Sequence, residues 1–139
     1  MLAPGTAFEV AIVDDPVVIG DRDEIHEAIA NVVDNTIKYA PGSPVRIAAR
    51  PVNGNALELT VADRGPGIHP EDRAGIFERF YRGATRGDVE GSGLGLAIAK
   101  RAVERAGGEL RLADTSPAGT VFAFRLRRDS SVPESVAVR

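Results

Sequence analysis

A stripe of polar residues in the first third of the chain repeats at helical spacing. Intervals of four, four and three residues place its members on one face of a helix. They are Glu27, Asn31, Asn35 and Lys38. An Asn oxygen is a suitable ligand for Mg²⁺, and a Lys one turn later can neutralise a phosphate. Because solvated helix faces carry the same residue types, the stripe alone fits both interpretations.

A turn-like segment, Asp63-Arg64-Gly65-Pro66-Gly67, follows a predicted strand. A carboxylate at a strand end can accept a hydrogen bond from an exocyclic amine, and glycines let a flat ring approach the backbone. The same residue types also make ordinary turns. The segment is therefore compatible with a base-binding site, but alone it does not establish one.

A glycine-rich segment, Gly91-Ser92-Gly93-Leu94-Gly95-Leu96, opens a predicted helix. The free N–H groups and the positive dipole end of a helix N-terminus suit a phosphate. The first two turns of this helix have no acidic residue, and its basic residues lie toward the other end. Because the spacing matches neither the dinucleotide fingerprint nor the P-loop, a flexible hinge is the alternative.

An aromatic and basic cluster, Phe77-Glu78-Arg79-Phe80-Tyr81-Arg82, precedes the glycine-rich segment. Phe77 and Phe80 have the spacing of neighbours on one helix face, so we expect both to pack onto the core. Arg79 and Arg82 have the same spacing and can reach phosphates. The alternative is a surface helix held down by two aromatic anchors.

Alternating and periodic apolar patterns predict the elements that position these residues. We expect strands at Phe8–Val13, Val17–Ile19, Val45–Val52, Leu57–Ala62, Leu110–Ala113 and Val121–Leu126. We expect helices from Asp21 to Ala40, from near Pro70 through Phe77 and Phe80, and from Gly93 to Ala106. Asp21 can cap the first helix, and Glu24 can complete a capping box.

These elements predict an α+β fold, a two-layer α/β sandwich rather than a doubly wound sheet. One mixed sheet of about five strands carries three helices on one face. A long polar stretch from Asp63 to Ser92 interrupts the regular elements. In a compact domain, a loop of this length is either functional or disordered.

Size and composition limit the function classes. The 139 residues suggest one domain, and we expect neither a membrane-spanning run nor a signal peptide. The absence of Cys excludes disulfides and thiolate metal sites. A net charge of −3 argues against a nucleic-acid partner.

The order and spacing of the four motifs resemble the N, G1, F and G2 boxes of histidine kinases, in the superfamily that includes gyrase, heat-shock-90 and MutL. The boxes correspond in order to Asn31–Tyr39, Asp63–Gly67, Phe77–Phe80 and Gly91–Gly95. The resemblance extends from about Phe8 to Arg127. It implies a histidine-kinase-type ATP-binding catalytic domain at residues 1–128 with a long ATP lid. Residues 129–139 are polar, and we expect them to form a mobile tail.

The resemblance also implies a role for each matching residue. Asn35 is the expected Mg²⁺ ligand, and Asp63 is expected to bind the adenine amino group. The expected catalytic residues are Asn31, Lys38 and Arg79. The expected ATP-binding residues are Asn31, Asn35, Lys38, Tyr39, Asp63, Gly65, Gly67, Ile68, Phe80, Arg82, Gly91, Ser92, Gly93, Leu94, Gly95, Leu96 and Thr120. ATP and Mg²⁺ are therefore the expected ligands.

Asn31 occupies the position that separates the subfamilies. Relatives that hydrolyse ATP, and the anti-sigma-factor kinases, carry a Glu there as general base, whereas histidine kinases carry Asn. We therefore expect weak intrinsic ATPase activity. The alternatives are a stand-alone Ser/Thr kinase or ATP-driven clamp, and a docking module that has lost ATP.

Neither histidine is the expected phosphoacceptor. An acid follows His26, as in the acceptor motif, but the continuation through Arg/Lys-Thr-Pro is missing. His26 also lies on the predicted ATP-binding helix. His69 is expected to cap the short lid helix.

The resemblance implies two protein partners: a phosphoacceptor His on a helix pair of the same kinase, which this sequence lacks, and a response regulator. We expect the chain to bind nucleotide as a monomer without phosphorylating itself. We expect no nucleic-acid partner and no direct membrane contact by this domain. The expected location is cytoplasmic, within a full-length protein that is membrane-associated.

Overall fold

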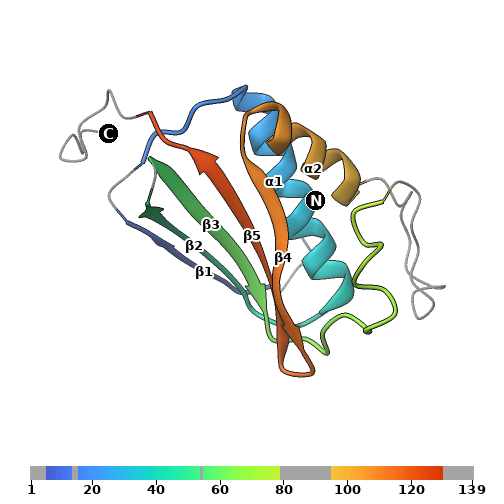
Figure 1. Ribbon diagram of the computed structural model, residues 1–139. Helices are drawn as coiled ribbons and strands as arrows, with labels where there is room; N and C mark the ends of the chain where they lie inside the picture. Colours follow the sequence, from blue (N-terminus) through green and yellow to red (C-terminus); the bar gives the residue numbers. More distant parts are fainter. Residues whose placement is uncertain (1–5, 14–15, 54, 79–94, 130–139) are drawn as a thin grey trace.

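The computed structural model describes residues 6–13, 16–53, 55–78 and 95–129. Within these ranges the chain forms five strands and two helices (Figure 1). In chain order they are β1 (Phe8–Ile12), α1 (Arg22–Tyr39), β2 (Val45–Val52), β3 (Ala56–Asp63), α2 (Gly95–Arg105), β4 (Glu109–Ser116) and β5 (Gly119–Arg127). Neither helix of the described ranges is both long enough and apolar enough to cross a membrane.

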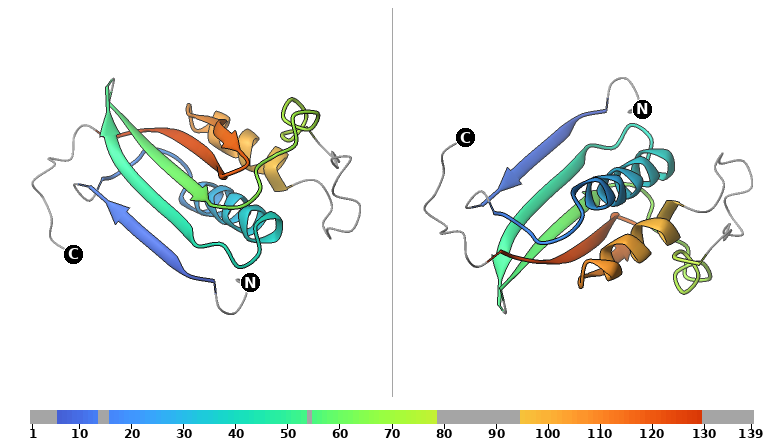
Figure 2. Two further views of the ribbon diagram at one scale, coloured as in Figure 1. Left: turned by 90° about the horizontal axis from the view of Figure 1, so that it is seen from below. Right: turned by 90° about the horizontal axis from the view of Figure 1, so that it is seen from above.

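The strands form one mixed sheet in the order β1-β2-β3-β5-β4. β1 runs parallel to β2, and all other neighbours are antiparallel. Both helices cover the same face of this sheet (Figures 1 and 2). The predicted two-layer α+β sandwich with a five-stranded mixed sheet is therefore confirmed.

The core lies between the sheet and the helices, because the central strands bury every second residue on that face. In β3 these residues are Leu57, Leu59 and Val61, and in β5 they include Phe122 and Phe124. The helices pack against them through residues at helical spacing: Ile25, Ala28, Val32, Val33, Ile37, Leu96, Ala99, Ala102 and Val103. Because β3 and β5 are antiparallel, the end of β3 lies beside the start of β5.

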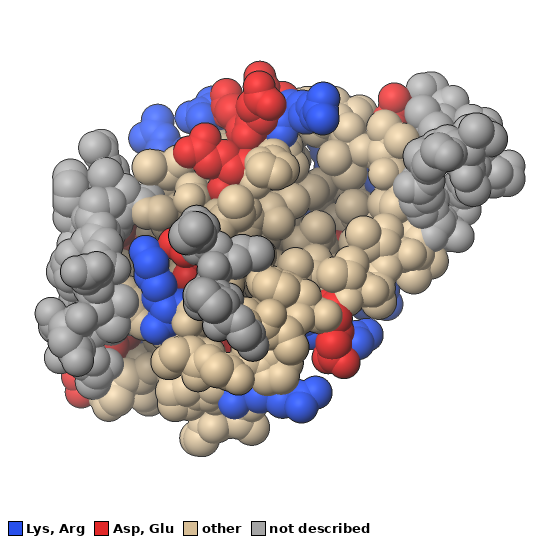
Figure 3. All heavy atoms as spheres, turned by 180° about the vertical axis from the view of Figure 1, so that it is seen from behind, with Lys and Arg blue, Asp and Glu red and all other residues tan. Residues whose placement is uncertain are grey.

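The start of α1 follows the sequence prediction in part. Asp21 caps the helix, since its side chain accepts a hydrogen bond from the backbone N–H of Glu24 at 3.0 Å. The predicted capping box is wrong, because the Glu24 carboxylate pairs instead with Arg105 of α2 at 2.9 Å. Figure 3 shows acidic and basic side chains together at the top of the molecule, where α1 begins and α2 ends. This ion pair joins the two helices.

The predicted strand at Val17–Ile19 is reduced to a single antiparallel bridge between Val18 and Arg128. Backbone hydrogen bonds of 2.8 Å lie on either side of the bridge. The pairing cannot extend further along the chain, because Asp21 already begins the helical turn two residues after Ile19.

The predicted helix from Pro70 is a series of separate turns over the described residues up to Glu78. Backbone N–H groups donate to the carbonyl three residues earlier only at every third position, namely at Asp72, Gly75 and Glu78. A glycine within a helix costs about 1 kcal/mol relative to alanine, which disfavours a continuous helix through Gly75. The described ranges therefore contain two helices on the sheet and not the three predicted.

Candidate nucleotide-binding site

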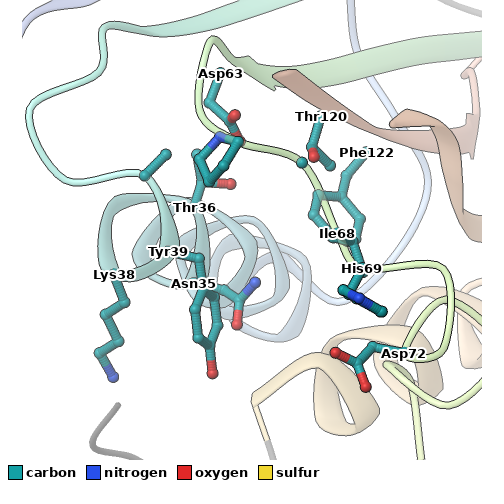
Figure 4. Close-up of a pocket in the computed structure, with 13 residues that line it drawn as sticks. Asn35, Thr36, Lys38, Tyr39, Asp63, Ile68, His69, Asp72, Thr120 and Phe122 are labelled. Atoms are coloured by element: carbon teal, nitrogen blue, oxygen red, sulfur yellow. The ribbon is translucent and has the colours of Figure 1, made fainter. Parts of the chain in front are cut away.

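A pocket of about 220 Å³ lies where the end of α1, the loop after β3 and the start of β5 meet (Figure 4). Its lining residues are Asn35, Thr36, Lys38, Tyr39, Ala40, Asp63, Pro66, Gly67, Ile68, His69, Asp72, Thr120 and Phe122. Whole small-molecule ligands usually occupy pockets of roughly 300–1,000 Å³. This pocket is therefore suited to a planar base, with the remainder of a nucleotide outside it.

Asp63 ends β3 at this pocket. Its backbone pairs with Thr120 of β5, and its Oδ1 accepts a hydrogen bond from the N–H of Gly65 at 2.8 Å. An ionised carboxylate has about four acceptor positions, so a ligand can still donate to it. The bond from Gly65 thus orients the carboxylate and leaves other acceptor positions available for a ligand.

Two glycines let the loop after β3 pass close to its neighbours. A Cβ at Gly65 would lie 2.5 Å from the Cβ of Ala40, the C-cap residue of α1. Gly67 has a φ of +83°, and a Cβ there would lie 2.1 Å from the carbonyl oxygen of Ser116. The sequence assigned these glycines to the approach of a flat ring; the packing of the loop requires them as well.

Side-chain hydroxyls from two distant segments hold the same loop. The Oγ1 of Thr115 accepts a hydrogen bond from the N–H of Ile68 at 2.8 Å and lies 2.9 Å from the Oγ1 of Thr120. On the other side, the Oγ of Ser43 accepts a hydrogen bond from the N–H of Arg64 at 2.9 Å. The loop is thereby fixed between the β4–β5 hairpin and the turn after α1.

The polar stripe of α1 reaches the pocket at its C-terminal end. Asn35, Lys38 and Tyr39 line the pocket. The Lys38 ammonium lies 3.1 Å from the Asp34 carboxylate, and both side chains are about two-fifths exposed. Asn31 is partly buried one turn earlier and is not among the lining residues. A phosphate can therefore recruit Lys38 only in competition with Asp34.

Several lining residues were not predicted from the sequence, namely Thr36, Ala40, Pro66, His69, Asp72 and Phe122. Thr36 and Asp72 are each 2% exposed, which is uncommon for polar side chains. Phe122 contacts Phe77 edge to face, with ring centroids 6.0 Å apart. The prediction that Phe77 packs onto the core is thus confirmed, and its ring joins the loop to the pocket.

The residues at both ends of the predicted lid differ in detail from their prediction. The Nδ1 of His69 accepts a weak hydrogen bond from the N–H of Glu71 at 3.4 Å, so His69 caps a turn rather than a helix. Leu96 is 6% exposed and packs into the core, so only its backbone can face a nucleotide. Other predicted site residues lie outside the described residues: Arg79, Phe80, Arg82, Gly91, Ser92, Gly93 and Leu94.

The start of α2 keeps the features expected of a phosphate-binding helix end. Gly95 begins the helix, and the first turn has no acidic residue. A Cβ at Gly95 would meet no atom within 4 Å among the residues that the structure describes. Neither Gly95 nor Leu96 lines the pocket, so this helix end can meet only the part of a nucleotide that projects from it.

Comparison with known proteins agrees with this geometry. Residues 20–130 match the family described as histidine kinase-, DNA gyrase B-, and HSP90-like ATPases. The chain belongs to this ATPase family. Its curated relatives include the signal transduction histidine-protein kinase/phosphatase MprB of Mycolicibacterium vanbaalenii, which is 44% identical over 114 residues, covering 81% of this chain. The corresponding protein of Mycobacterium tuberculosis is 44% identical over 103 residues, covering 73% of this chain.

Solved structures assign the ATPase-family chain to the histidine kinase branch. The mycobacterial sensor histidine kinase MprB is 40% identical with a TM-score of 0.79, covering 89% of this chain and 84% of that one. The catalytic domain of histidine kinase ThkA is 25% identical with a TM-score of 0.74, covering 89% and 80%. The predicted identity as a histidine kinase catalytic, ATP-binding domain is confirmed. The chain spans about a fifth of the length of these two curated relatives, namely 23% of the Mycolicibacterium vanbaalenii protein and 20% of the Mycobacterium tuberculosis protein.

Proposed function

We propose that the chain binds Mg-ATP in this pocket and donates the γ-phosphate to a histidine on a separate phosphoacceptor segment. The observation that carries the proposal is Asp63, a carboxylate in a base-sized pocket that Asn35 and Lys38 of α1 also line (Figure 4). In this arrangement the Asp63 carboxylate can bind the base, and the Lys38 ammonium can bind the phosphates of the same ligand. The structure of full-length ShkA in complex with AMPPNP, 28% identical with a TM-score of 0.78, supports nucleotide binding by this fold.

Adenine matches the chemistry of the pocket. Its exocyclic amine is a donor, and the Asp63 carboxylate accepts hydrogen bonds only. Guanine would present a carbonyl oxygen to that carboxylate, so the site favours ATP over GTP. Thr120, Tyr39 and Ile68 line the remaining walls around the base.

The triphosphate lies toward the exposed side of the pocket in this proposal. Lys38 supplies a positive charge once its ammonium turns away from Asp34. The start of α2, with no acid in its first turn, supplies backbone N–H groups. Arg79 and Arg82, which lie outside the described ranges, complete the set that we propose.

The reaction we propose is phosphoryl transfer by positioning and charge stabilisation. A ring nitrogen of the acceptor histidine attacks the γ-phosphorus, so that a P–N bond forms while the P–O bond to ADP breaks. In a neutral imidazole the attacking nitrogen carries a lone pair and no proton, so the attack needs no base. Asn31 cannot act as a base for water, because an amide has no useful basicity. The chain is therefore suited to transfer rather than to hydrolysis.

We expect the chain alone to release phosphate from ATP far below the roughly 1–10³ s⁻¹ typical of enzymes. The reason is that Asn31 stands where hydrolytic relatives need a carboxylate. Phosphate release should be equally slow in wild type and in Asn31→Ala. Fast turnover that disappears in Asn31→Ala would contradict the proposed transfer function and favour an ATPase.

Asn35 is the residue to which we assign Mg²⁺. Mg²⁺ usually takes one or two protein oxygens and keeps its other positions for water and phosphate. Within the described ranges, no three or more acidic or histidine side chains converge into a metal cage. A single amide oxygen beside the phosphates fits the usual arrangement. The ion would neutralise charge on the phosphate oxygens.

Replacing Asn35 with Ala should weaken ATP binding about tenfold in Mg²⁺, in line with the loss of one contact to a charged group. With EDTA present, the variant and the wild type should bind ATP equally. Isothermal titration calorimetry with and without Mg²⁺ measures both values. Asn53→Ala, in the β2–β3 turn away from the pocket, is the matched control. An equal loss with and without Mg²⁺ would contradict the metal assignment.

The remaining proposals concern the whole protein. We propose that the acceptor helices belong to the same kinase, that a response regulator receives the phosphate, and that the full-length protein is membrane-associated. We also propose residues 1–128 as the catalytic domain and 129–139 as a tail. The N–H of Asp129 donates to the carbonyl of Val17, so the hydrogen-bonded fold reaches one residue past this proposed boundary.

Calorimetric titration of the chain with ATP tests the binding proposal directly. Mg²⁺-dependent binding in the micromolar range, with little binding of GTP, is the expected result. For the transfer proposal, the chain is mixed with γ-labelled ATP and the remaining segment of a mycobacterial relative. That segment should acquire an acid-labile, base-stable label, as phosphohistidine does. A label that resists acid would indicate a Ser/Thr acceptor and contradict the proposal.

A further inference from the structure

The hydroxyl of Thr36 is buried in the pocket wall without a hydrogen-bond partner. Thr36 is 2% exposed, and its Oγ1 is the one such unpartnered side-chain atom among the residues that the structure describes. Leaving a buried hydroxyl unpaired costs free energy, because its hydrogen bonds to water are lost on folding. A polar atom in this condition calls for an explanation.

The fold itself does not explain this hydroxyl. A threonine within a helix usually donates to the carbonyl one turn earlier, and Thr36 makes no such bond within the described structure. Its neighbours on the buried face of α1 are Val32, Val33 and Ile37. A valine at position 36 has nearly the same shape and would leave no polar atom unpaired. Packing alone therefore does not account for the hydroxyl.

Thr36 and Asp63 lie on the same side of the pocket. Both line it, and Thr36 is one helical turn before Ala40, whose N–H donates to the Thr36 carbonyl at 2.9 Å. A Cβ built on Gly65 would lie 2.5 Å from the Cβ of Ala40 and 3.2 Å from Oδ1 of Asp63. The Asp63 carboxylate thus approaches the face of α1 that carries Thr36, as Figure 4 shows for the two labelled residues.

We propose that the Thr36 hydroxyl donates a hydrogen bond to N1 of the adenine ring, beside the contact of Asp63 with the exocyclic amine. Adenine presents these two groups next to each other, one a donor and one an acceptor. A carboxylate can only accept, whereas a hydroxyl can donate. Together the two side chains bind both N1 and the exocyclic amine of adenine. This inference rests on the proposed binding of ATP and assigns a further specificity residue to that site.

The test combines a nearly isosteric variant with an altered ligand. ATP and 1-deaza-ATP, which lacks the N1 acceptor, are titrated into wild type, Thr36→Val and Thr60→Val. Thr60 lies on the opposite face of β3 from Leu59 and Val61, so it serves as the matched control. Thermal unfolding of each nucleotide-free chain is measured in parallel.

Wild type and Thr60→Val should bind 1-deaza-ATP roughly five- to tenfold more weakly than ATP, the usual effect of one hydrogen bond. Thr36→Val should bind ATP more weakly than wild type does, by the same factor. The variant should bind 1-deaza-ATP as tightly as it binds ATP. Its Tm without nucleotide should equal or exceed that of wild type, because an unpaired buried hydroxyl has been removed. A purely structural role for Thr36 would instead lower the Tm.

The inference is overturned if Thr36→Val discriminates between the two nucleotides as strongly as wild type does. It is also overturned if the variant has a lower Tm than wild type and its affinities for the two nucleotides fall by the same factor. Failure of the wild-type chain to bind ATP at all would overturn the proposed function, and this inference with it. Normal ATP binding by wild type combined with either of the first two results would leave the proposed function standing.

Discussion

Replacing Asp63 with Asn is expected to weaken ATP binding by about a hundredfold. A hydrogen bond to a charged group contributes about 1.5–3 kcal/mol, and 1.4 kcal/mol corresponds to a factor of ten. The amide of Asn would keep one oxygen acceptor but lose the charge, and its NH₂ group can meet the adenine amine donor to donor. The bond from the Gly65 N–H to Oδ1 also weakens when the acceptor is neutral. Calorimetric titration with Mg-ATP measures the loss.

Asp114→Asn is the matched control for that experiment, because Asp114 is exposed in β4 and does not line the pocket. The control should bind Mg-ATP as wild type does. Thermal unfolding of both variants without nucleotide separates a binding effect from a folding effect. Unchanged affinity in Asp63→Asn with an unchanged Tm would mean that the base does not bind at Asp63, and the assignment of this pocket to adenine would be wrong.

The sequence alone names candidate site residues where their side chains have a recognisable chemistry. Asp63, Asn35 and Lys38 stand at the end of a strand or along one helix face, where their spacing can be read without a structure. The residues that hold the pocket loop were missed, because they act through contacts between distant segments. Thr115 binds the backbone 47 residues earlier, and Ser43 binds it 21 residues later. A Ser or Thr in a turn-like context gives no indication of such a partner.

The boundaries of the last two strands show a second limit of sequence reasoning. The predicted strand at Leu110–Ala113 extends as β4 to Ser116, and its partner begins at Gly119 rather than Val121. A register shift between Leu112 and Asp114 breaks the alternation that a strand pattern relies on. The polar residues beyond the bulge were therefore left out of the predicted strands, although they form the hairpin whose hydroxyls hold the pocket loop.

The sequence predicted one mixed sheet of about five strands, but not the order of the strands or which pair is parallel. Alternation along β3 and β5 indicated one buried face, which was correct. Which strands become neighbours depends on how α1 and α2 fit over that face together. The parallel pairing of β1 with β2 across α1 leaves no local signal in either strand. Tertiary packing therefore decided the arrangement that brings Asp63 beside Thr120 and opposite α1.

Replacing Gly67 with Ala should lower the free energy of unfolding by at least about 3 kcal/mol, at the upper end of usual single substitutions. Two costs add. The φ of +83° strains any residue with a Cβ, by roughly 1–2 kcal/mol. The new Cβ would also lie 2.1 Å from the carbonyl oxygen of Ser116, which is backbone and cannot rotate away. Either the β4–β5 turn or the pocket loop must move, so Mg-ATP binding should be lost as well.

Gly42→Ala separates the two costs, because Gly42 has a similar φ of +80° and a Cβ there would meet nothing within 4 Å in the described structure. Urea unfolding should therefore give this control a loss of only about 1–2 kcal/mol, the strain alone. The difference between the variants isolates the collision with Ser116. Equal losses, with ATP binding kept in both, would mean that the loop and the hairpin are not packed as tightly as this geometry requires. In that case Gly67 would serve only the turn, and the close packing of the loop would not be what shapes the pocket.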